Sequence, residues 1–94
     1  MIVRIVKLSF ETAQVDLFLA HFAAVESQIR STKGNMFLEL YRDIGRPNVF
    51  FTYSHWSTEQ DLENYRNSDF FKTVWATTKA MFNDKPQAWT CQKN

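Results

Sequence analysis

The sequence predicts an α+β fold in which four strands form one antiparallel sheet and the helices cover one of its faces. The chain of 94 residues is long enough for one domain and too short for two. With 45% hydrophobic residues it can bury a substantial core. Strand-like and helix-like patterns alternate along it in the order βαββαβ. We therefore expect a single domain over residues 1–94, of the ferredoxin-like type.

The first half of the chain predicts a strand, a long helix and a second strand. Residues 2–10 are rich in β-branched side chains, which is typical of a strand. Thr12 is a candidate N-cap. Gly34 tolerates the left-handed conformation that ends many helices, and residues 35–43 form the second strand. Between them the apolar residues recur near every 3.6 positions, as expected of a helix: Val15, Phe18, Leu19, Phe22 and Ile29.

The second half predicts a third strand, a helical segment in two parts and a last strand. A turn over residues 44–48 leads into the strand 49–56. Ser57 with Gln60 resembles a capping box that opens a short helix, and Ser68 is an N-cap candidate for a longer one. That helix should end by Lys85, because Pro86 disfavours helical conformation at the residue before it. Residues 87–92 form the fourth strand, and the apolar stripe of the longer helix is Phe71, Val74, Trp75, Thr78 and Phe82.

Large apolar residues occupy both faces of the predicted sheet. On the first strand one face carries Val6, Leu8 and Phe10, and the other carries Val3 and Ile5. A sheet with one face in water would alternate apolar and polar residues, and one helical layer covers only one face. Burying several hundred Å2 of the second face at ~25 cal/mol per Å2 would stabilise a pair of chains by several kcal/mol. We therefore expect a homodimer; the alternative is a monomer whose strand ends are hydrated.

Composition and charge indicate which binding partners and which cellular compartment to expect. A net charge of +1 disfavours a strong interaction with nucleic acid or with an anionic membrane. The single cysteine, Cys91, cannot form an internal disulfide, which is typical of a reducing cytoplasm. Residues 1–4 begin a strand-like run instead of a secretion signal, and no apolar stretch is long enough to span a membrane. We expect a cytoplasmic protein that binds neither nucleic acid nor membrane.

Several common site motifs are missing from the sequence. The two histidines, His21 and His55, lie far apart and only one cysteine is present, so no metal-ligand spacing occurs. There is no glycine-rich phosphate loop, nucleophile elbow or Cys-x-x-Cys pair. Neither a metal nor another cofactor is therefore expected.

Three stretches resemble a known family. They are Asn-Val-Phe-Phe-Thr-Tyr-Ser-His-Trp over 48–56, Tyr-Arg-Asn-Ser-Asp-Phe-Phe-Lys over 65–72, and Lys-Ala-Met-Phe-Asn-Asp-Lys-Pro-Gln-Ala-Trp over 79–89. Together with the order of elements, they are similar to the antibiotic biosynthesis monooxygenase domain. The resemblance implies a dimeric α/β barrel in which two sheets face one another. Members of the family include cofactor-free oxygenases of quinols and polycyclic phenols, haem-degrading enzymes, and proteins of unassigned role.

The haem-degrading branch of the family can be compared residue by residue. Its members carry asparagine where Val6 stands, tryptophan where Tyr65 stands, and a haem-ligating histidine where Trp75 stands. The chain departs from that pattern at all three positions. Tryptophan has only an N–H donor and cannot ligate iron, so the resemblance does not extend to haem.

His55 is the candidate catalytic residue. It is the one histidine on a predicted strand, and an imidazole can accept a phenolic proton near neutral pH. The alternative is that its half-exposed ring merely completes a strand end. His21 lies on the shoulder of an apolar helix stripe and is interpreted as a boundary histidine with its hydrogen bonds satisfied. The candidate substrate-binding residues, which could equally be core or surface residues, are Tyr53, Trp56, Tyr65, Arg66 and Trp75.

Three functional hypotheses follow. The first, which the resemblance implies, is a cofactor-independent monooxygenase of small aromatic or quinol-like compounds. The second is a non-catalytic, ligand-binding or stress-related dimer on the same fold. It is kept because a fold does not fix a function. The third is RNA binding through strand aromatics such as Phe51 and Tyr53, which the balanced charge and the missing glycine-bearing basic signature disfavour.

Overall fold

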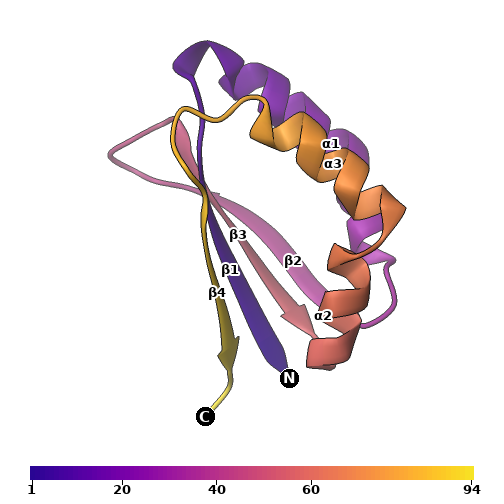
Figure 1. Cartoon of the computed structure of the whole chain (residues 1–94). Helices are drawn as coiled ribbons and strands as arrows, with labels where there is room; N and C mark the ends of the chain where they lie inside the picture. The colour runs from indigo at the N-terminus through magenta and orange to yellow at the C-terminus, as the bar shows by residue number, and fades with distance from the viewer.

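The computed structural model describes all 94 residues and has the predicted order of elements. Neighbouring strands are antiparallel throughout, and the sheet order is β2-β3-β1-β4. The helices lie together on one side of the sheet, and the two chain ends lie at the same end of it (Figure 1). The predicted ferredoxin-like α+β architecture is confirmed. The elements are β1 (Ile2–Ser9), the 3-10 turn η1 (Thr12–Gln14), α1 (Val15–Arg30), β2 (Asn35–Arg42), β3 (Val49–Trp56), α2 (Glu59–Arg66), α3 (Asp69–Lys79) and β4 (Gln87–Gln92).

Side-chain caps divide the second helical segment into two helices. Ser68 caps α3 as predicted, because its hydroxyl accepts a hydrogen bond of 3.1 Å from the backbone N–H of Phe71. The cap of α2 lies one residue later than the predicted Ser57. Thr58 holds the extended conformation there, and its Oγ1 accepts a hydrogen bond of 3.1 Å from the N–H of Asp61. The break between the helices therefore places α2 at the end of β3 and α3 along the sheet (Figure 1).

Several boundaries differ from the prediction, and β1 and β2 each end one residue before their predicted ends at 10 and 43. Thr12 opens the short turn η1, without a side-chain cap, and the long helix begins only at Val15. α3 already ends at Lys79, so Pro86 lies in the segment that leads to β4 and does not end the helix. Gly34 has a φ of +86°, as its predicted role requires, but it lies in the turn before β2 and not directly after α1.

The core lies between α1 and the helix-facing side of β1 and β3. Leu8 pairs with Phe50 across these strands, and both are buried. Phe10 stacks on Phe18 with ring centroids 4.1 Å apart, and neither ring is exposed to any extent. Aromatic rings packed in this way contribute more than their buried area alone. The six residues of this cluster are Leu8, Phe10, Val15, Phe18, Phe50 and Met81.

The opposite face of the sheet, here called the open face, carries no helix (Figure 1). Large aromatic side chains are exposed on it, namely Phe37 at 37%, Tyr41 at 48% and Trp89 at 46%. All six residues of β4 are exposed, although this strand pairs with β1 along its whole length. The prediction of large apolar residues on both faces is thus confirmed. The alternation of β2 is interrupted at Met36, since a register irregularity between Asn35 and Phe37 leaves its side chain 61% exposed.

Candidate functional site

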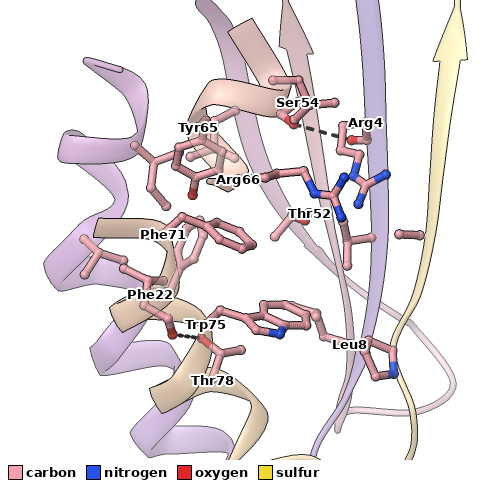
Figure 2. A pocket seen from close by; sticks show the side chains of 18 of the residues that line it. Arg4, Leu8, Phe22, Thr52, Ser54, Tyr65, Arg66, Phe71, Trp75 and Thr78 are labelled. Atoms are coloured by element: carbon pink, nitrogen blue, oxygen red, sulfur yellow. Dashed lines mark hydrogen bonds between the residues drawn. The ribbon is translucent and has the colours of Figure 1, made fainter. Parts of the chain in front are cut away.

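A cavity of about 330 Å3 lies between the helices and the sheet. It is lined by 21 residues, of which 14 are hydrophobic, so a bound molecule would be held mainly by apolar contact. α1, α2 and α3 supply one wall, and the helix-facing side of the sheet supplies the other (Figure 2). Its volume suits one small ring system, at the lower end of the usual range for ligand pockets.

Aromatic rings from three elements form a continuous wall of this cavity. Tyr65 of α2 stacks on Trp56 at the end of β3, with centroids 4.9 Å apart. Phe71 meets Tyr65 edge to face at 5.1 Å and lies nearly parallel to Trp75 at 5.9 Å, with 11° between the ring planes. Phe71 and Trp75 are four residues apart on α3, which places them on the same helix face. A wall of this kind suits the face of a flat aromatic ligand.

A buried hydrogen bond fixes the first ring of this wall. The indole Nε1 of Trp56 donates to Ser54 Oγ at 3.0 Å, and these residues are only 1% and 7% exposed. A buried indole N–H usually finds such a partner, because leaving it unpaired is costly. The position of Trp56, and of the Tyr65 ring stacked on it, is thereby set by the inner side of β3.

The phenol of Tyr65 stays protonated in this environment. Burial raises its pKa from 10.0 to about 12, because the charged phenolate is poorly solvated between the rings. At neutral pH Tyr65 can therefore donate a hydrogen bond into the cavity, but it does not act as a base.

Two arginines reach the cavity from opposite walls. Arg4 extends from the inner side of β1, and Arg66 extends from the last turn of α2 towards it (Figure 2). Burial lowers the pKa of Arg4, and the nearby positive charge of Arg66 lowers it further, while Glu63 opposes this shift. Arg4 was missed by the sequence analysis, although it alternates in phase with the inward-facing Val6 and Leu8.

One imidazole also lines the cavity, and it belongs to His21 of α1. Its Nε2 is buried and has no hydrogen-bond partner within the chain. The sequence interpretation of His21 as a satisfied boundary residue is wrong in this respect. Among the lining side chains, only this imidazole offers a ring nitrogen of the kind that serves as a general base. Its place on the edge of an apolar stripe was the one signal available in the sequence.

The structure brings together four of the six predicted site residues and separates two. Trp56, Tyr65, Arg66 and Trp75 all line the cavity. His55 and Tyr53 do not. Successive residues of a strand point to opposite faces, so both lie on the open face, across the sheet from the cavity.

On the open face, His55 belongs to a second group of rings. Its ring lies 5.0 Å from that of Phe37 and 5.1 Å from that of Tyr53, while Tyr41 lies 6.3 Å from Tyr53. These four residues are called the open-face cluster below. The Nε2 of His55 is buried there without a partner, and the sheet separates it from a molecule held in the cavity of the same chain.

The chain lacks a metal-binding cluster and a membrane-spanning helix. No group of three or more histidine, cysteine, aspartate or glutamate side chains is arranged to hold a metal ion. None of the helices has the length and apolar character needed to cross a membrane.

Comparison with known proteins identifies relatives of this fold. A protein described as an antibiotic biosynthesis monooxygenase superposes with a TM-score of 0.93 over 100% of this chain and 99% of its own, at 14% identity. A conserved protein from Methanosarcina mazei Go1 gives 0.92 over 100% and 94%, at 17% identity. A protein from Mycobacterium tuberculosis gives 0.90 over 99% and 94%, at 12% identity. Identities this low show a shared fold and not a shared activity.

Sequence comparison gives the family itself. No curated protein matches the chain at a significant level. Residues 1–77, most of the chain, match the family described as antibiotic biosynthesis monooxygenase. The match includes β1, β3, α2 and nearly all of α3, which carry the aromatic wall and both arginines. The chain therefore belongs to the antibiotic biosynthesis monooxygenase family.

Proposed function

We propose that the cavity is the substrate site of a cofactor-independent monooxygenase that acts on small aromatic, quinol-like compounds. The observation that carries this proposal is the buried, unpartnered Nε2 of His21, a residue that lines the same cavity as the wall of flat aromatic rings. A quinol bound against Trp75 can give its phenolic proton to His21 Nε2. The resulting anion is electron-rich enough to pass one electron to O2, which leaves a semiquinone and superoxide.

The other lining groups have separate roles in this proposal. Phe71 and Trp75 hold the ring by stacking, and the Trp56–Ser54 hydrogen bond keeps the wall rigid. Tyr65 remains a neutral donor because its pKa is raised to about 12. His21 takes the place that the sequence analysis gave to His55, since only His21 lies on the cavity side of the sheet.

The main alternative is a non-catalytic dimer that binds a small ligand in the same cavity. That function would fit a cavity filled by Trp75 and Phe71 and without converging polar groups. Instead an open cavity remains, and polar side chains enter it from β1, α1 and α2. This difference favours the oxygenase, and the experiment below separates the two functions.

The test is O2 uptake by the purified protein with a panel of one-, two- and three-ring quinols. We expect uptake above the spontaneous rate, and a loss of about 100-fold or more in His21→Gln, because positioned general bases commonly contribute that much. His55→Gln is the matched control, since it makes the same change on the opposite face of the sheet.

The outcomes of this test are distinct. Loss of activity in His55→Gln but not in His21→Gln would return the catalytic role to His55 and move the site to the open face. Quinols that bind without faster O2 uptake would support the ligand-binding alternative. Uptake that stays at the spontaneous rate across the panel would contradict the oxygenase.

We also propose that the chain forms a homodimer through the open face. The exposed aromatic rings and β4, whose six residues are all exposed, are the support, because a single chain leaves them in water. A second copy of the sheet would cover both, as in a barrel of two facing sheets. Sedimentation velocity should then give about twice 11.1 kDa for the wild type, and a smaller mass for Tyr53→Glu. A wild-type mass near 11.1 kDa at micromolar concentration would contradict the dimer.

A further inference from the structure

The cavity has an unbalanced charge. Its lining contains two arginines, Arg4 and Arg66, and one histidine, His21, but no aspartate or glutamate. Charged groups that are partly buried are normally paired with an opposite charge. Here the pairing within the chain is incomplete, so a negative charge from outside the chain would complete it.

The two arginines differ in what already neutralises them. Arg66 forms an ion pair with Glu63 at 3.3 Å, on a helix surface where both side chains are partly exposed. Arg4 forms no ion pair. Its Nη1 donates to the neutral hydroxyl of Thr90 at 2.6 Å, which leaves most of its five N–H donors unused. The pair of guanidinium groups therefore carries about one uncompensated positive charge.

The two guanidinium groups also converge in space. They come from different walls, β1 and α2, and Figure 2 shows their ends pointing toward one another, in agreement with the effect of the Arg66 charge on the pKa of Arg4. Two like charges held this close repel each other unless an anion lies between them. A planar guanidinium matches the two oxygens of a carboxylate in a bidentate arrangement.

We propose that Arg4 and Arg66 form a carboxylate-binding subsite, so that the ligand of the cavity is a flat aromatic carboxylate. The ring lies along the wall of Phe71 and Trp75, and the carboxylate lies between the two guanidinium groups. This inference rests on the proposed function, because it specifies the substrate class of the same cavity. A monoanion balances the single uncompensated charge, whereas a phosphate dianion would leave an excess negative charge in a mostly apolar cavity.

The test compares ligands that share one ring system and differ in charge. The probes are 2-naphthoate, its neutral methyl ester and 2-naphthyl phosphate, together with the corresponding one-ring and three-ring compounds, titrated by calorimetry into the wild-type protein. We expect the carboxylate to bind at least about tenfold more tightly than its ester, because hydrogen bonds to charged groups are worth about that factor or more. Added salt should weaken the binding of the carboxylate and leave the binding of the ester unchanged.

Three variants locate the effect. Arg4→Gln and Arg66→Gln should each lower the affinity for the carboxylate by about tenfold and leave the affinity for the ester unchanged. Arg46→Gln is the matched control, since it removes the same charge from an exposed side chain in the β2–β3 turn, paired with Asp43. Arg46→Gln should change the affinity of neither the carboxylate nor the ester. The comparison of acid with ester needs only the wild type, so it stands even if a variant fails to fold.

The outcomes distinguish failure of the carboxylate subsite alone from failure of the proposed oxygenase as well. Equal binding of acid and ester, with no effect of either arginine substitution, would overturn the carboxylate subsite and leave the proposed oxygenase intact. Tighter binding of the phosphate than of the carboxylate would also overturn it. If no compound of any ring size bound and no quinol sped O2 uptake, the cavity would not be a ligand site, and both proposals would fail.

Discussion

Stability at alkaline pH provides a direct test of how deeply Tyr65 is buried in the cavity wall. The phenol ionises near 10.0 in the unfolded chain, while burial raises its pKa to about 12 in the folded one. Below pH 10 both states keep the proton, so Tyr65 adds no pH dependence. Between pH 10 and 12 the unfolded chain loses the proton and the folded chain keeps it, so stability falls as the pH rises. Two pKa units at about 1.4 kcal/mol each give a loss of about 2–3 kcal/mol.

The variant Tyr65→Phe isolates this effect. Phenylalanine keeps the ring between Trp56 and Phe71 and removes only the ionisable hydroxyl. Urea unfolding followed by circular dichroism, at one protein concentration, gives the free energy of unfolding at each pH. We expect the difference between wild type and variant to be constant below pH 10, and to shift by about 2–3 kcal/mol in favour of the variant by pH 12. Parallel curves through pH 12 would refute the reasoning, and so would a tyrosinate absorbance difference that titrates near pH 10.

Three substitutions test local features of the fold by urea unfolding at neutral pH. Ser54→Ala should lower the free energy of unfolding by about 1–3 kcal/mol, because the buried N–H of Trp56 loses its acceptor; a change below about 0.3 kcal/mol would mean that the bond contributes nothing. Gly34→Ala should cost at least about 1 kcal/mol, since Gly34 has a φ of +86° and a methyl group there would meet the side chain of Asp61; an unchanged midpoint would contradict this. Ser68→Ala should cost about 0.5–2 kcal/mol as the cap of α3 is lost, whereas Ser68→Asp, which can still cap, should retain most of the stability.

Local signals in the sequence were sufficient for most of the fold. The strands 49–56 and 87–92 have the predicted bounds, because Pro47 and Asn48 mark the start of the first and Pro86 marks the start of the second. Ser68 was recognised as a cap because a capping side chain acts on backbone groups three residues away. Thr58 and the early end of α3 were missed. Neighbouring residues competed for the cap in the first case, and in the second the chain leaves the helix to pair Phe10 with Phe82, a contact across 72 residues.

The sequence by itself determined the two-sided apolar sheet. The alternation of its strand residues also determined that the predicted site residues of β3 lie on two different faces. His55 and Tyr53 share a phase on β3, and Trp56 has the opposite phase, so they could not line one cavity. Only the tertiary structure showed which face the helices cover. It also brought Arg4, Arg66 and His21 together from three separate elements. The physical reason is that periodicity fixes which side chains share a face, whereas the charge, burial and pairing of a group depend on what packs opposite it.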